Sequence, residues 1–165
     1  MTGRGQWTGK AERRREENGR DREKNTLGTS TGLSLSLRKG DQLLFSSCGR
    51  GLRPLLMCAR LWPGPVSGRV LIDRITGIAA ARVIAAAQLA GRVESGVITR
   101  KAIRHLKKRG IATEGREITE IILCRDRTGP CPMEELSLRY QSDREFLSAL
   151  YQNFSLELPE FVSRI

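Results

Sequence analysis

The sequence predicts an α/β fold in which a mixed sheet is covered by helices. The stretch Leu33–Leu37 alternates apolar and polar residues, as half-buried strands do, and a second strand-like run follows it after a turn. A long apolar helix follows the short β-favouring run Val70–Ile72. After this helix, further β-favouring runs alternate with helical stretches. This order is typical of layered α/β domains.

The first elements form a predicted β-hairpin and a short helix. Leu33–Leu37 alternates with period two, residues 38–41 (RKGD) have turn chemistry, and Gln42–Ser46 reads as the second strand. Pro54 suits the first turn of a helix that runs to Leu61, and the sequence WPGP then ends it.

The central stretch, Val70–Gly91, organises the rest of the chain. We expect Asp73 to cap the helix N-terminus and Gly91 to end the helix in the left-handed conformation. Between Thr76 and Ala90 only Arg82 and Gln88 are strongly polar. A helix that is apolar on most faces is buried on more than one side.

Five more elements follow the central helix. The first four are marked by local signals: a β-favouring run, a Thr99 cap with Gly110 after the helix, a second β-favouring run, and Pro132 followed by acidic residues. The predicted elements are a strand at Arg92–Ile98, a helix at Arg100–Arg109, a strand at Glu117–Cys124, a helix start at Pro132 and a helix at Asp143–Asn153 that buries Phe146, Leu147, Leu150 and Tyr151.

Composition divides the chain into three parts. Residues 1–32 contain few large apolar side chains, so we expect a disordered basic extension. Residues 33–153 form the predicted domain, and residues 154–165 are left as a C-terminal tail.

A formal charge of +11 raises the question of nucleic-acid binding. The excess is spread along the chain, at +3 over residues 1–32 and +8 over residues 33–165. Aromatic residues, which would stack on bases, are scarce. The basic face of the helix Arg100–Arg109 therefore reads as a solvated surface, with an RNA-binding or protein-interaction module as the alternative.

The four cysteines form no CxxC pair, and the N-terminal residues have no apolar segment typical of a secretory signal. We expect a cytoplasmic protein with reduced thiols, no membrane span, no metal and no cofactor.

One candidate binding residue set lies where the central strand meets the central helix. Asp73, Arg74, Thr76 and Gly77 follow the strand, and helix N-termini after strands bind anions in α/β folds. The alternative is that Asp73 is only a cap and Gly77 only a packing contact.

A second set lies at the start of the helix near Pro132. Arg125, Cys131 and Glu134 stand at this junction, and a helix dipole can activate a thiol such as Cys131. A thiol enzyme also needs a base, and the single histidine, His105, has no visible tie to Cys131.

Zinc deaminases use an H-x-E motif at one strand–helix junction and P-C-x-x-C at another. The sequence has IDR at the first junction, and the stretch 130–134 (PCPME) has one cysteine where two are required. Zinc-dependent deaminase activity is therefore not expected.

Several stretches together resemble a small uncharacterised prokaryotic family whose fold is similar to that of cytidine deaminases. They are residues 50–56 (RGLRPLL), Asp73 with Gly77 and residues 79–81, residues 97–99 (VIT), residues 110–111 (GI) and residues 129–134 (GPCPME).

The resemblance implies a three-layer α/β domain that has lost the zinc ligands. The family is loosely associated with ADP-ribosylation and implies no established activity. This chain departs from the family pattern at Ile78, where a basic residue is expected, and at Cys124, where an asparagine is expected.

We therefore expect a domain that binds, or is modified by, a nucleotide or ADP-ribose. The predicted pocket has Asp73, Arg74, Thr76 and Gly77 on one side and Arg125, Cys131 and Glu134 on the other.

Overall fold

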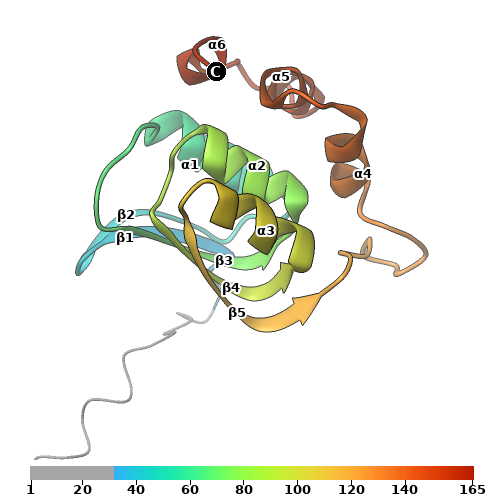
Figure 1. Cartoon of the computed structure of the whole chain (residues 1–165), viewed down its shortest axis with the longest axis horizontal. Coiled ribbons are helices and arrows are strands. Elements are labelled where there is room, and N and C mark those ends of the chain that lie inside the picture. The colour runs from blue at the N-terminus through green and yellow to red at the C-terminus, as the bar shows by residue number, and fades with distance from the viewer. Residues whose placement is uncertain (1–31) are drawn as a thin grey trace, which may run out of the picture. The chain divides into compact units, whose positions relative to one another are not determined.

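The computed structural model describes residues 32–165, which form one compact unit (Figure 1). The expected disordered extension over residues 1–32 therefore falls, apart from Gly32, outside the described residues.

The described chain contains a mixed five-stranded sheet with the order β2-β1-β3-β4-β5. β1 runs antiparallel to both β2 and β3, whereas β3, β4 and β5 are parallel. The strands are β1 (Leu35–Lys39), β2 (Gln42–Ser47), β3 (Arg69–Thr76), β4 (Arg92–Thr99) and β5 (Ala112–Thr119).

Helices lie in two further layers above the sheet in Figure 1. The layer next to the sheet holds α1 (Arg53–Leu61), α2 (Ile78–Ala86) and α3 (Arg100–Lys108). The outer layer holds α4 (Pro132–Arg139), α5 (Asp143–Asn153) and α6 (Glu160–Ser163). The predicted three-layer α/β class with a mixed sheet is confirmed.

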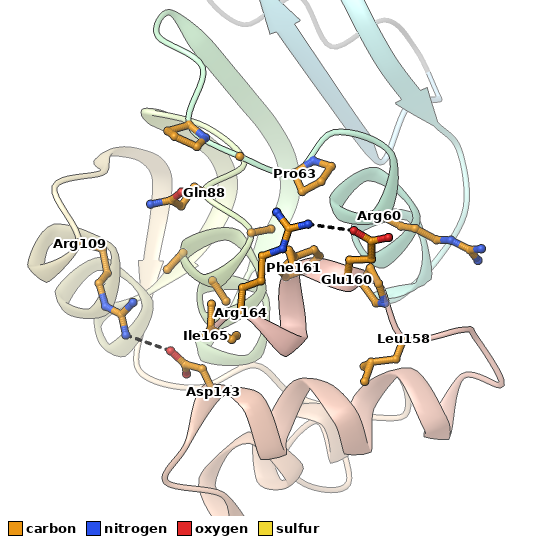
Figure 2. A pocket seen from close by; sticks show the side chains of 16 residues that line it. Arg60, Pro63, Gln88, Arg109, Asp143, Leu158, Glu160, Phe161, Arg164 and Ile165 are labelled. Atoms are coloured by element: carbon orange, nitrogen blue, oxygen red, sulfur yellow. Dashed lines mark hydrogen bonds and ion pairs between the residues drawn. The ribbon is translucent and has the colours of Figure 1, made fainter.

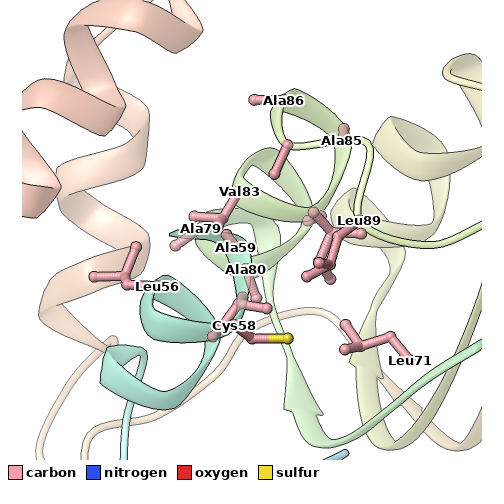
Figure 3. Close-up of a cluster of buried hydrophobic side chains, with 14 of the residues drawn as sticks. Leu56, Cys58, Ala59, Leu71, Ala79, Ala80, Val83, Ala85, Ala86 and Leu89 are labelled. Carbon is pink, nitrogen blue, oxygen red and sulfur yellow. The ribbon is translucent and has the colours of Figure 1, made fainter. Parts of the chain in front are cut away.

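Helix α2 occupies the middle of this arrangement. Every residue from Ala79 to Ala86 is buried, because β3, α1, α3, α4 and α5 all contact the helix. Figure 3 shows Ala79 and Ala80 of α2 beside Cys58 and Ala59 of α1, with Leu71 of the sheet nearby. Short side chains let the neighbouring elements approach closely. The prediction of a helix buried on more than one side is confirmed.

Both predicted ends of α2 are wrong. Asp73 does not cap the helix, because β3 continues to Thr76 and Asp73 pairs in register with Leu35 and Ser95. Strand pairing on both sides overrides the local capping signal, and Gly77 is the N-cap residue. The C-terminal end of α2 also lies before the predicted Gly91.

The C-terminal end of α2 is a Schellman motif at Gln88. Gln88 has a φ of +49°, its N–H donates to Ala85 O, and the Leu89 N–H donates to Ile84 O. Because glutamine rarely adopts this left-handed conformation, the sequence pattern indicated Gly91 as the residue that ends the helix.

The last strand also differs from its prediction. We expected Glu117–Cys124, but β5 begins at Ala112 and ends at Thr119, and Leu123 makes only an isolated bridge with Pro130. β5 is an edge strand with mostly exposed side chains, so its apolar pattern is weak.

The other predicted elements are confirmed by local geometry. The hairpin, α1 and α4 form where expected. Thr99 Oγ1 accepts a hydrogen bond from Ala102 N at 3.1 Å, and Gly110 adopts a φ of +73° after α3. α5 spans the predicted Asp143–Asn153 and buries the four residues expected.

Arg82, the one charged side chain of α2, connects the middle helical layer to the outer helical layer through hydrogen bonds. Its guanidinium donates to Asp143 Oδ1 at 2.7 Å, to Tyr140 O at 2.8 Å and to Ser137 O, and it lies over the ring of Phe146. A buried guanidinium is tolerated only when its donors are satisfied. All these partners lie in α4, α5 or the link between them.

Three further findings concern the rest of the described chain. All four cysteines are free. No helix among residues 32–165 has the length and apolar character needed to cross a bilayer. The segment expected as a tail contains α6, whose Val162 is fully buried.

Replacing Arg82 by alanine should lower the free energy of unfolding by about 3–5 kcal/mol, because Asp143 and two backbone carbonyls would lose their buried partner. Urea denaturation followed by circular dichroism measures the loss. Arg92→Ala is the control, since the half-exposed pair of Arg92 with Glu114 is worth less than about 1 kcal/mol. Equal losses in the two variants would contradict the assignment.

Candidate functional site

The carboxylate of Glu134 occupies the N-terminus of α2. Ile78 N donates to Glu134 Oε2 at 3.0 Å, and Ala79 N donates to Glu134 Oε1 at 2.9 Å. The first N–H groups of a helix have no partner within the helix and favour negative charge. The chain therefore supplies its own anion at the place where the sequence suggested a bound phosphate.

Gly77 makes room for this carboxylate. A Cβ atom on Gly77 would lie 2.3 Å from Glu134 Oε1. The backbone at Gly77 is extended, with a φ of −91°, so the glycine is required by space and not by conformation.

Asp73 and Thr76 lie beside this contact, at the end of β3. Thr76 Oγ1 donates to Asp73 Oδ2 at 2.9 Å. Burial raises the pKa of Asp73 to about 7, and the hydrogen bond from Thr76 opposes part of that rise. This aspartate therefore titrates near neutral pH.

The side chains of the two predicted arginines, Arg74 and Arg125, lie away from this group of residues. Arg74 is exposed, and its guanidinium donates to Leu33 O at 3.4 Å. Arg125 is exposed in the turn between β5 and α4. Hydrogen bonds and close packing bring Asp73, Thr76, Gly77 and Glu134 together where β3, α2 and α4 meet. Among the described residues, Arg125 makes no such contact with this group.

Cys131 is the N-cap residue of α4, one turn before Glu134. Its carbonyl accepts hydrogen bonds from the N–H groups of Glu134 and Glu135. His105 lies in α3, where burial lowers its pKa and the charge of Asp143 opposes the shift. No hydrogen bond joins His105 to Cys131 in the described part of the chain, so the thiol mechanism stays a prediction without a base.

The turn before α4 is built around Cys124. Its thiol donates to Asp126 Oδ1 at 2.8 Å and accepts from Gly129 N at 3.3 Å. Hydrogen bonds from Cys124 and Thr128 lower the pKa of Asp126 to about 2. No group of three His, Cys, Asp or Glu side chains among residues 32–165 is placed to hold a metal ion.

A cavity of about 770 Å³ lies at the opposite end of α2 (Figure 2), and no local sequence motif predicts it. The end of α2, the Pro63–Pro65 turn and the C-terminal residues supply most of its lining, and Arg109 and Asp143 add to it. Its lining includes Pro63, Ala86, Gln88, Arg109, Asp143, Leu158, Phe161, Arg164 and Ile165.

The arginines of this cavity are paired with carboxylates of the same chain. Arg164 Nη2 lies 2.9 Å from Glu160 Oε2, and Figure 2 shows this pair over the middle of the cavity. Arg109 Nη2 lies 2.9 Å from Asp143 Oδ2. Arg60 points away from the centre in Figure 2 and pairs with Glu157.

Comparison with known protein families identifies one family that matches this domain. Residues 24–154 match the TM1506 family, described as a domain of unknown function, DUF1893. The chain belongs to the DUF1893 family.

A crystal structure of a DUF1893 family protein, TM1506 from Thermotoga maritima, is similar to this chain, with a TM-score of 0.67 and 24% identity. The match covers 74% of this chain and 81% of the other, and at this identity it supports the fold alone. No curated protein matches the chain significantly.

The titration of Asp73 predicts a pH-dependent stability for this DUF1893 domain. The folded state, with a pKa of about 7, holds a proton that the unfolded chain releases near its ordinary pKa of 3.8. Stability from this group is therefore full at low pH and is lost as the pH rises towards 7, by at most about 1.4 kcal/mol per pH unit. Asp73→Asn should flatten this part of the profile.

Urea titrations at several pH values measure the effect. Asp126→Asn is the contrasting variant, because a carboxyl with a pKa lowered to about 2 changes its contribution only in acid. A wild-type profile parallel to that of Asp73→Asn from about pH 4 to 7 would show that Asp73 is not the titrating group.

The Gly77–Glu134 contact predicts non-additive mutations. Gly77→Ala displaces the carboxylate, and Glu134→Ala removes it, so each should cost about 1–2 kcal/mol by leaving two helix N–H groups without their acceptor. The double variant should lose little more than either single one. Urea denaturation of all four proteins completes the cycle, and fully additive losses would contradict a shared contact.

Proposed function

We propose that this domain binds a nucleotide or an ADP-ribose-like molecule in the cavity lined by Arg109 and Arg164, without deaminating it. The observation that carries the proposal is a cavity with guanidinium groups at its centre and rim and apolar surface between them.

The size and lining of the cavity suit a ligand of this class. A volume of about 770 Å³ falls within the usual range for small-molecule sites. Pro63, Leu158 and Phe161 offer apolar surface for a base or a ribose. Guanidinium groups bind phosphate oxygens through paired hydrogen bonds.

Of the two arginines, Arg164 is the one that a ligand can most easily engage. Its pair with Glu160 is exposed on both sides, so the pair contributes little and a ligand phosphate can replace the carboxylate. Arg109 shares Asp143 with the buried Arg82, so that carboxylate stays in place while Arg109 turns.

The other end of α2 supports a ligand less well. A phosphate there would have to displace Glu134 from two short hydrogen bonds. The predicted binding residues around Asp73 and Arg125 are therefore the alternative ligand site in the binding experiment below.

The proposal retains the expected similarity to cytidine deaminases in the fold, but it does not include their chemistry. The H-x-E and P-C-x-x-C patterns are absent from the sequence, so the proposed function is binding.

Isothermal titration calorimetry with ADP-ribose and AMP tests the proposal, with ribose as the uncharged comparison. We expect phosphate-bearing ligands to bind and Arg164→Ala to weaken their binding at least about ten-fold, the effect of one charge-assisted contact. Arg100→Ala is the matched control, because Arg100 forms a similar exposed pair with Glu120 outside the cavity.

The outcomes separate the two locations. Loss of binding in Asp73→Ala and Arg125→Ala, with Arg164→Ala unaffected, would move the ligand to the strand-end set. No binding by any of these ligands would overturn the proposal. Mass spectrometry of native and denatured protein distinguishes a bound nucleotide from a covalent modification, since only the latter survives denaturation.

A further inference from the structure

We propose that the exposed face of α3 binds the phosphate backbone of double-stranded DNA without reading its sequence. The residues concerned lie outside the lining of the ligand cavity, so the inference is independent of the proposed nucleotide binding.

The basic side chains of α3 gather on one side of the helix. α3 packs against α2 and over β4 and β5, and it buries Ala102 and Leu106 there (Figure 1). With 3.6 residues per turn, its exposed basic residues fall within an arc of about 120° on the opposite side. This basic face consists of Arg100, Lys101, Arg104, Lys107 and Lys108.

Most of this charge has no counter-charge within the domain. Over residues 32–165, only Arg100 of the basic face forms an ion pair, with Glu120, and both side chains are exposed. α3 itself contains no acidic residue. Like charges three and four residues apart, as at Arg100, Arg104 and Lys108, repel each other on a helix. A bound polyanion would replace this repulsion with attraction.

The helix dipole explains only part of the pattern. Lys107 and Lys108 lie in the last turn, where positive charge is favourable. Arg100 and Lys101 lie in the first turn, where positive charge is unfavourable, and no acidic residue accompanies them there. The cations of the first turn therefore point to a partner outside the helix.

The composition of the basic face favours a phosphate backbone over a protein surface. Protein interfaces are centred on apolar and aromatic anchors, but every exposed large apolar side chain of residues 32–165 lies outside α3. Contacts to phosphates require only cations and hydrogen-bond donors. Aromatic residues that would stack on the bases of a single strand are scarce in the chain, which favours a duplex.

The length of the basic face fits B-form DNA. Eight residues separate Arg100 from Lys108, a rise of about 12 Å along the helix axis. The major groove of B-DNA is also about 12 Å wide, so the two ends of the row can reach phosphates of both strands. The major groove of duplex RNA is deep and narrow, and it does not offer this arrangement.

Fluorescence anisotropy of a labelled DNA duplex of arbitrary sequence, titrated with the full chain, tests the proposal. If the four unpaired cations each neutralise one phosphate, the logarithm of the affinity should fall against the logarithm of the salt concentration with a slope of about −3.6. Between about 50 and 200 mM salt the affinity should therefore fall roughly 100-fold. No binding at the lower salt concentration would overturn the proposal.

Charge reversal identifies the surface. Lys101→Glu with Arg104→Glu should weaken binding at least about ten-fold and reduce the slope to about −2. The fold should persist, because a carboxylate at position 101 suits the first turn and one at position 104 faces Lys108 one turn later. Circular dichroism checks this.

Lys39→Glu with Arg50→Glu is the matched control. Both residues are exposed, lie outside α3 and have no ion pair in the described part of the chain. The control changes the net charge by the same amount and should bind DNA close to the wild-type affinity. Equal weakening in the two double variants would show that total charge determines binding, and it would overturn the assignment to α3.

Competition with other polyanions tests the identity of the partner. We expect duplex DNA to compete better than single-stranded DNA, duplex RNA or polyglutamate of equal charge. Stronger competition by either of the other nucleic acids would overturn the choice of duplex DNA. Polyglutamate that competes as well as DNA would assign the basic face to an acidic protein and overturn the proposal equally.

Discussion

The complete burial of α2 is the constraint on which the rest of the structure depends. A helix enclosed by a sheet and by other helices cannot leave its terminal N–H and C=O groups to water. Glu134 satisfies the N-terminal groups, and the turn at Gln88 satisfies carbonyl groups at the other end. The one guanidinium of the helix, on Arg82, is satisfied by the segment that follows Glu134. One stretch of the outer layer thus caps the helix and also holds it in place.

This arrangement makes the two ends of α2 unequal as locations for the proposed ligand. The end of α2 that usually attracts anions is closed by Glu134 and by the lack of space above Gly77. The opposite end is covered by the Pro63–Pro65 turn and by short C-terminal pieces, and the ion pair of Arg164 there is exposed on both sides. Exposed pairs exchange partners at little cost, whereas buried ones do not. The ion pair that can most easily exchange its partner is therefore the one at the C-terminal end of α2.

The elements with local signals could be predicted from the sequence. α5 matches its prediction to the residue because Phe146, Leu147, Leu150 and Tyr151 repeat at helical spacing within this short stretch. Asp73 was assigned to a helix cap because a local pattern cannot show that two strands pair with it. Gly77 and Glu134 were both selected as ligand-binding residues, but only the folded chain shows that they contact each other. The cavity escaped prediction because its walls come from distant segments without a common motif.

The family match covers some of the residues discussed above and not others. The match ends at residue 154, so Gly77, Arg82 and Glu134 lie within it, whereas Leu158, Phe161 and Arg164 lie beyond it. The residues that cap and clamp α2 therefore lie within the matched region, whereas one wall of the cavity lies in the segment that follows it. The proposed ligand contact of Arg164 accordingly uses a residue outside the region on which the family match rests.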